Sequence, residues 1–171
     1  MKKALIAYFS HAGENFVNRK IIPLEIGNTE VAAGIISEIT GADMFKIDTE
    51  TPYPYDYKQC VEVSKTELKA NARPKLARDI DVSPYDVIFV GYPCWCGTMP
   101  MPVLTFLEKA GVDGKIIMPF CTNEGSRMGR SEAEIKKLCP SSDIKEGLSI
   151  HGAEAADAKQ DIEKWIIAQK V

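Results

Sequence analysis

The architecture is indicated first by one apolar run, ALIAYF at residues 4–9. The run is short, shows no alternation of polar and apolar residues, and is followed at once by Ser10 and His11. Two runs of the same kind lie at Val87–Gly91 and Ile116–Phe120. Continuous apolar runs with β-branched or aromatic residues are typical of parallel strands that are covered on both faces. These three segments therefore predict the centre of a parallel sheet.

Two weaker runs, Met44–Ile47 and Ile144–Ile150, predict further strands. Pro119 is expected near the end of its strand, because proline has no N–H to donate to a neighbouring strand. Between the predicted strands, apolar residues recur at helical spacing and predict helices. Ser131, followed three residues later by Glu134, predicts a capping box at the start of one of these helices. The helical segments are 31–39, 56–72, 103–110, 135–138 and 158–169. Strand and helix alternate, so we expect one doubly wound α/β domain over residues 1–171, with right-handed crossovers.

Composition narrows the class of protein. The 171 residues carry a formal net charge of −3, with 45% hydrophobic and 26% charged residues, which is typical of a globular domain. The mild acidic excess argues against a nucleic-acid partner, which needs clustered positive charge. The apolar runs are too short for a secretory signal or a membrane span, so we expect a cytoplasmic protein without a membrane partner.

Cysteine usage and missing motifs exclude several kinds of site. The five cysteines form no Cys-x-x-Cys pair, and with two histidines they supply no zinc site and no disulfide framework. The chain lacks Gly-x-Gly-x-x-Gly, Walker A, Gly-x-Ser-x-Gly and His-Glu-x-x-His motifs. We therefore predict no metal site and no catalytic residue of those classes.

Ligands of doubly wound sheets bind beyond the carboxyl ends of the strands, which directs attention to three loops. The first loop runs from Ser10 to Glu30 and ends in Gly27–Glu30 before a helix. Hydroxyl, amide and glycine residues at a helix N-terminus suit a phosphate, although Asn28 or Thr29 would equally serve as an ordinary N-cap.

The second loop, Tyr92–Pro102, has no charged residue, and three prolines stiffen it. Its Trp95 either stacks on a planar ligand or folds back onto the core. The third loop, Cys121–Ser126, is either a plain connection or a source of polar groups for the edge of a ring. A phosphate site, an aromatic loop and a polar loop together suit an elongated ligand of the shape of flavin mononucleotide (FMN).

The three loops resemble those of the flavodoxin family. The segment Trp95–Pro100 is similar to a Trp-Gly-Thr-Met-Pro signature with one residue interposed, and Ser10 with Gly27–Glu30 is similar to the phosphate loop. Residues 120–126 resemble the third loop. The resemblance implies a five-stranded parallel sheet in the order 2-1-3-4-5, with helices on both faces, and FMN as cofactor.

The same resemblance implies which residues bind the cofactor. Ser10, Asn28 and Thr29 would contact the phosphate, Trp95 and Gly97 would flank the isoalloxazine, and Thr122, Glu124 and Gly125 would meet its edge. The full expected set is Ser10, His11, Ala12, Asn28, Thr29, Pro93, Cys94, Trp95, Cys96, Gly97, Thr98, Thr122, Asn123, Glu124 and Gly125.

The chain departs from the family pattern in several places. Residues 12–26 interrupt the phosphate loop and are expected as a long loop, because strand-to-helix connections are usually about 2–6 residues long. Cys96 takes the place of an aromatic residue, and no tyrosine follows in the third loop. The second face of the ring is then open, or it is covered by Met99 or Met128. His11 either contacts the phosphate or the ribityl chain, or it is an exposed loop residue.

By resemblance, the expected function is one-electron transfer between redox partner proteins, a reductase and an acceptor, by a monomer or weak dimer. One alternative is an NAD(P)H-dependent flavin or quinone reductase, which the modest charge of −3 favours over a strongly acidic carrier. Another is a flavin-free binding module on the same fold. Cys94 and Cys96 are expected to have no redox role.

Overall fold

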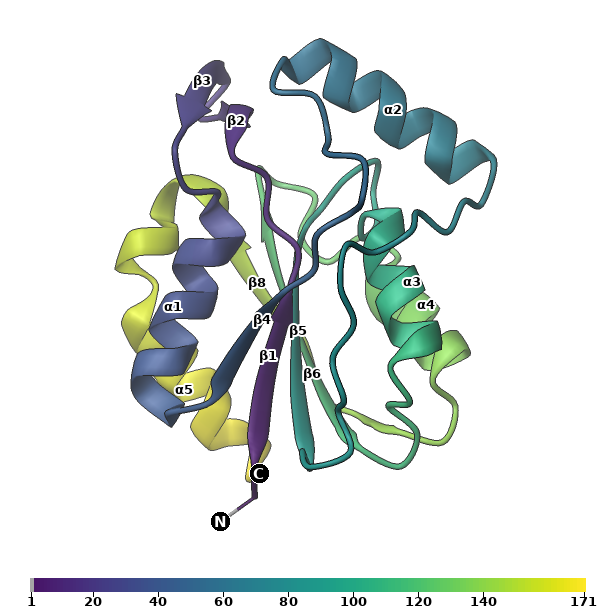
Figure 1. Ribbon diagram of the computed structural model, residues 1–171. Helices are drawn as coiled ribbons and strands as arrows, with labels where there is room; N and C mark the ends of the chain where they lie inside the picture. The colour runs from purple at the N-terminus through teal and green to yellow at the C-terminus, as the bar shows by residue number, and fades with distance from the viewer. Residues whose placement is uncertain (1) are drawn as a thin grey trace.

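The computed structural model describes residues 2–171. Six strands form one sheet in the order β4-β1-β5-β6, with β7 and β8 both paired to the outer side of β6 (Figure 1). All neighbours are parallel. The strands are β1 (Ala4–Tyr8), β4 (Asp43–Lys46), β5 (Val87–Pro93), β6 (Ile116–Asn123), β7 (Asp143–Ile144) and β8 (Leu148–His151). The predicted doubly wound sheet and its strand order are confirmed, with the fifth strand divided in two.

Helices cover both faces of the sheet. Figure 1 shows α1 (Asn28–Thr40) and α5 (Lys159–Gln169) on one side, and α3 (Met101–Lys109) and α4 (Ser131–Leu138) on the other. Each pair buries its own apolar cluster against the sheet. The helix α2 (Tyr57–Lys69) lies higher, toward the edge where the parallel strands end, and a short 3-10 helix, η1 (Gly152–Asp157), follows β8. None of the helices in residues 2–171 is long and apolar enough to cross a bilayer.

Pro119 lies in the middle of β6, so the prediction that it lies near the strand end was wrong. Backbone groups two residues apart in a strand face the same neighbouring strand, so Pro119 and Ile117 face the same side of β6. The Ile117 carbonyl on that side accepts from Lys145 N at 2.9 Å. On that side β7 pairs with residues 116–117 and β8 with residues 120–123. The missing N–H therefore falls in the break between two short strands.

The predicted capping box of α4 was also wrong. Arg130 occupies the N-cap position without a side-chain cap, and Ser131 is the first helical residue. The Ser131 hydroxyl instead donates to Met128 O at 2.5 Å and accepts from the Tyr92 hydroxyl at 2.8 Å. Glu134 is bonded to the Thr98 hydroxyl. These residues fasten the second loop to α4 instead of starting the helix.

Residues 12–26, expected as a loop, contain an antiparallel hairpin made of β2 (Gly13–Val17) and β3 (Lys20–Leu24). Asn18 and Arg19 form its two-residue turn with φ values of 48° and 65°. Positive φ at both central positions is the geometry that suits the twist of a hairpin, and asparagine tolerates it well. The hairpin stands above the carboxyl ends of the sheet, next to α2 (Figure 1).

Candidate functional site

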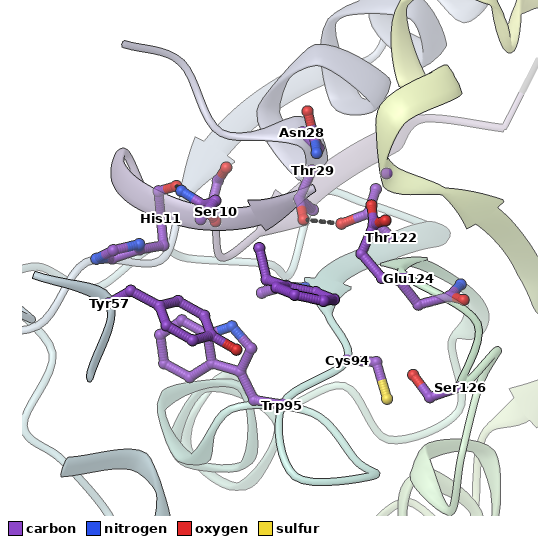
Figure 2. Close-up of a pocket in the computed structure, with 15 residues that line it drawn as sticks. Ser10, His11, Asn28, Thr29, Tyr57, Cys94, Trp95, Thr122, Glu124 and Ser126 are labelled. Atoms are coloured by element: carbon purple, nitrogen blue, oxygen red, sulfur yellow. Dashed lines mark hydrogen bonds between the residues drawn. The ribbon is translucent and has the colours of Figure 1, made fainter. Parts of the chain in front are cut away.

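A cavity of about 230 Å³ lies where the three loops meet, beyond the ends of β1, β5 and β6. Figure 2 shows side chains from all three loops pointing into it. The hairpin, α2 and η1 complete its wall. Its lining residues are Ser10, His11, Asn15, Phe16, Asn28, Thr29, Tyr57, Pro93, Cys94, Trp95, Thr122, Asn123, Glu124, Ser126 and Gly152.

One end of the cavity is the N-terminus of α1. Gly27 is the N-cap and makes no side-chain cap bond, so the interpretation of Asn28 or Thr29 as an N-cap was wrong. Ser10 Oγ accepts from Glu30 N at 3.1 Å. No bond among the described residues takes up the N–H groups of Asn28 and Thr29. Free N–H groups at a helix start, with neutral side-chain donors beside them, form a site for an anion.

His11 lines the cavity and is only 9% exposed, so the interpretation as an exposed loop residue was wrong, and a contact with the ligand stays a prediction. Its Nε2 lies 2.9 Å from Pro54 O, and burial lowers the pKa of the imidazole, which the bond to Pro54 opposes. The ring is therefore neutral at pH 7. Among the described lining residues there is no lysine or arginine, so an anion here would be held by neutral donors.

Side-chain bonds tie the third loop to the first and give it shape. The hydroxyls of Thr29 and Thr122 are 2.7 Å apart and buried, and this bond is drawn in Figure 2. Asn123 Oδ1 accepts from Gly125 N at 2.9 Å and Arg127 N at 3.0 Å. The predicted residues Thr29, Thr122 and Asn123 thus hold the loops together as well as lining the cavity.

Trp95 belongs both to the cavity and to the core. Its ring meets Phe9 and Tyr53 edge to face, each at a centroid distance of 5.2 Å. It also lines the cavity, where it lies beside Tyr57 (Figure 2). The interpretation in which Trp95 folds back onto the core is confirmed, and this packing fixes the ring in the cavity wall. Stacking on a planar ligand stays a prediction.

Five predicted residues do not line this cavity: Ala12, Cys96, Gly97, Thr98 and Gly125. Cys96 and Gly97 have φ values of 52° and 80° and form a tight turn, closed by bonds between Trp95 and Thr98. Thr98 is buried, and Gly97 O accepts from Arg130 N at 2.9 Å. Gly97 and Thr98 therefore shape the second loop from behind, while exposed Cys96 lines an adjoining cavity.

Met99 and Met128 are both buried within the core cluster that includes α3 and α4. Neither lines the cavity, which contradicts the alternative in which one of them covers the second face of the ring. Aromatic residues that the sequence analysis missed lie at the cavity instead. Phe16 of the hairpin stacks on Tyr57 of α2 at 6.2 Å and 29°. Asn15, Ser126 and Gly152 were missed as well.

A signal for the missed residues exists in the hairpin. Asn18-Arg19 between two five-residue segments with β-branched and aromatic residues is a recognisable hairpin pattern, and it would have placed Phe16 beside the phosphate loop. Asp56 accepts from Gln59 N at 2.9 Å and starts α2, which places Tyr57 at the first turn. Gly152 carries no signal of this kind.

Cys94 is a partly exposed thiol in the cavity wall, beside Ser126 (Figure 2). The neighbouring Cys121 thiol, helped by Ser126, Gly97 N–H and the charge of Arg130, lowers the pKa of Cys94 from 9.0 to about 6, against the opposing effect of burial. The proximity of Cys94 and burial raise the pKa of Cys121. Cys94 is therefore the thiol of this pair that more readily loses its proton.

We expect iodoacetamide to alkylate Cys94 with a rate that is half-maximal near pH 6, because the thiolate is the nucleophile. Mass spectrometry of each cysteine-containing peptide over a pH series measures it. The Cys94→Ser variant should lose this labelling and keep that of exposed Cys96, while buried Cys60 and Cys139 stay unlabelled. A Cys94 rate that keeps rising up to pH 9.0 would contradict the prediction.

A second cavity, of about 270 Å³, adjoins the first between the second loop and α2. The two share five lining residues, namely His11, Asn15, Tyr57, Cys94 and Trp95. The second cavity is further lined by Val61 and Ser64 of α2. Across residues 2–171, no group of three or more His, Cys, Asp and Glu side chains is placed to hold a metal ion.

A family model described as Flavodoxin matches residues 3–169. The chain is 28% identical to a candidate flavoprotein from Bacteroides eggerthii DSM 20697, with a TM-score of 0.82 over 100% of this chain and 99% of that chain. A candidate flavoprotein from Bacteroides uniformis ATCC 8492 is 24% identical, with a TM-score of 0.77 over 97% of this chain and 98% of that chain.

A third solved structure is a flavoprotein from Lactobacillus acidophilus NCFM in complex with FMN. It is 21% identical, with a TM-score of 0.70 over 97% of this chain and 99% of that chain. At this identity the likeness concerns the fold. No curated protein matches the chain.

Proposed function

This chain belongs to the flavodoxin family, and from that premise we propose that it binds FMN in the three-loop cavity and carries electrons between redox partner proteins. The observation that carries the proposal is the meeting of three loops at one cavity, with free N–H groups of a helix at one end and the Trp95 ring in the wall. The Lactobacillus acidophilus relative in complex with FMN supports this choice of ligand.

The donors and acceptors of the cavity suit FMN. The N–H groups of Asn28 and Thr29 with the Ser10 hydroxyl would hold the phosphate without a cationic side chain. Gly152 lines the cavity, and a Cβ on it would lie 2.7 Å from Glu124 Oε1 and 2.8 Å from Asn28 Nδ2. The glycine therefore lets these two polar side chains pack against the backbone at the cavity wall.

When bound, FMN supplies the electron-transfer chemistry, and the protein binds and tunes it. Trp95, fixed by Phe9 and Tyr53, would flank the ring. Phe16 and Tyr57 supply a further aromatic surface at the same cavity. The second loop, Tyr92–Pro102, has no charged residue that could stabilise added negative charge on the ring, so it disfavours that charge.

A second candidate function is an NAD(P)H-dependent reductase of small planar acceptors. The adjoining cavity of about 270 Å³ favours it, because that cavity shares Trp95 and Tyr57 with the first and offers room for a second small molecule. A protein that only passes electrons to other proteins needs no such space.

Two measurements test the proposed function. Titration of FMN into the purified protein should quench flavin fluorescence with one equivalent bound; no binding would overturn the proposal and leave the flavin-free module. Anaerobic stopped-flow mixing of the FMN-loaded protein with NADH and NADPH should then give only slow reduction. Direct reduction faster than about 1 s⁻¹, within the range of ordinary turnover numbers, would favour the reductase instead.

A further inference from the structure

Three aromatic rings form one cluster that begins in the cavity wall. Trp95 meets Tyr53 and Phe9 at 5.2 Å each, and Phe9 meets Tyr53 at 5.4 Å, measured between ring centroids. All three pairs are edge to face, which is a favourable geometry for aromatic packing. Because Trp95 and Tyr53 are in direct contact, an electron can pass between them without crossing intervening groups.

The Tyr53 hydroxyl is paired with a carboxylate. It donates to Glu67 Oε2 of α2 at 2.6 Å, a length typical of a hydroxyl bonded to a charged acceptor. Burial and the bond to Glu67 raise the pKa of Tyr53, so the phenol keeps its proton at rest. Burial also raises the pKa of Glu67, against the opposing effect of this bond. Glu67 is therefore a base within reach of the Tyr53 proton.

The cluster connects two separate surfaces of the protein. Trp95 lines both cavities (Figure 2). Tyr53 lines neither of them, and together with Glu67 it lines a groove of about 480 Å³ between residues 49–54, α2 and residues 72–75. An electron that moves from Tyr53 to Trp95 therefore moves from this groove to the cavity.

We propose that Trp95, Tyr53 and Glu67 form a relay that moves a one-electron oxidation from the cavity to the groove, with proton transfer from Tyr53 to Glu67. The relay protects the cavity, because an oxidising equivalent that reaches Trp95 is passed on and does not remain beside the ligand. The inference rests on the proposed function only for the source of the oxidant, since a redox cofactor in the cavity would lie beside Trp95.

The electrons and protons of the relay balance. A one-electron oxidant takes an electron from the Trp95 indole, and any proton that the indole releases to water is taken up again when the ring is reduced. Tyr53 supplies that electron and gives its phenolic proton to Glu67 Oε2. The products are the reduced oxidant, intact Trp95, a neutral Tyr53 radical and a neutral Glu67 carboxylic acid. A soluble one-electron reductant restores Tyr53, which regains its proton from Glu67.

Both partners of Tyr53 follow from this chemistry. An oxidised phenol is a strong acid, so tyrosine gives up its electron readily only where a base takes the proton, and Glu67 is that base. The benzene ring of Phe9 is much harder to oxidise than an indole or a phenol. Phe9 therefore packs the cluster without carrying the electron.

Pulse radiolysis of the full chain in azide solution tests the relay without a cofactor. The azide radical oxidises tryptophan in preference to tyrosine, and the radicals of the two residues have different absorption spectra. All proteins carry Trp165→Phe, which leaves Trp95 as the single tryptophan. In this background we expect the tryptophan radical to decay and a tyrosine radical to appear at the same first-order rate, independent of protein concentration.

Two variants separate the steps of the relay. Tyr53→Phe should abolish the transfer. Glu67→Gln keeps an acceptor for the Tyr53 hydroxyl but provides no base, so it should slow the transfer by about a hundredfold, the lower end of what a positioned base contributes. Tyr85→Phe is the matched control and should keep the background rate. Tyr85 also donates to a carboxylate, Asp43 Oδ2 at 2.8 Å, but it does so at the amino ends of β4 and β5.

Three results would overturn the inference. The first is a tyrosine radical that still forms at the background rate in Tyr53→Phe, the second is an unchanged rate in Glu67→Gln, and the third is an equal loss in Tyr85→Phe. Circular dichroism of each variant checks that the fold is kept. A chain that binds no FMN would defeat the proposed function and leave the radical transfer intact, so the two failures are distinguishable.

Discussion

Gly91→Ala should destabilise the fold by about 3 kcal/mol, at the upper end of the usual cost of overpacking a core. Gly91 lies in β5 between β1 and β6, opposite Phe120. A Cβ there would lie 2.1 Å from Phe120 Cζ and within 2.7 Å of both neighbouring ring carbons. Phe120 is fully buried, so its ring has no free space into which to move. Urea unfolding followed by circular dichroism measures the loss.

Gly34→Ala is the matched control for this prediction. Gly34 lies inside α1, and a Cβ at this position meets nothing within 4 Å. Replacing a helical glycine by alanine should raise the unfolding free energy by about 0.5–1 kcal/mol. The same substitution is thus expected to lower the unfolding free energy at Gly91 and to raise it at Gly34. A Gly91→Ala protein as stable as the wild type would show that the Phe120 ring shifts freely and that the core beside β1 is loosely packed.

The contrast between these glycines shows where sequence reasoning works and where it ends. The runs at β1, β5 and β6 were predictable because strands covered on both faces need continuous apolar sequence. The sequence does not show that Gly91 faces the Phe120 ring, because that contact depends on the register between β5 and β6. The break between β7 and β8 was hidden for the same reason, since it depends on which strand lies beside Pro119.

For the candidate site as well, the sequence predicted residues that the sheet topology places and missed residues that distant contacts place. Ser10 and Trp95 lie two residues beyond the ends of β1 and β5, Thr122 lies at the end of β6, and Asn28 begins α1. The topology of a doubly wound sheet therefore brings these four residues together. Phe16 was missed because an insertion of this length was interpreted as a loop. Hairpins fold by local turn chemistry, but their position over a sheet depends on distant contacts such as that between Asn18 N and Glu124. Gly152 was missed because it lies in η1, which follows the predicted run 144–150 and has no pattern of its own in the sequence.

Gly27→Ala should weaken FMN binding by roughly ten- to hundredfold, which corresponds to an overpacking cost of about 1–3 kcal/mol placed at the anion end of the cavity. A Cβ on Gly27 would lie 2.2 Å from Ser10 Oγ and 2.7 Å from His11 O. Because His11 O is a backbone atom, the two halves of the phosphate loop must separate. Ser10 Oγ would then lose its bond from Glu30 N, and the first turn of α1 would move away from Ser10.

The diagnostic quantity is the ratio of the dissociation constants for FMN and riboflavin. Riboflavin lacks the phosphate, so its binding should change much less in Gly27→Ala, and the preference for FMN should shrink. Gly34→Ala, in the same helix and without a clash, should keep the wild-type ratio. If Gly27→Ala also keeps that ratio, the phosphate does not bind at the start of α1, and neutral donors at this helix are not what selects FMN.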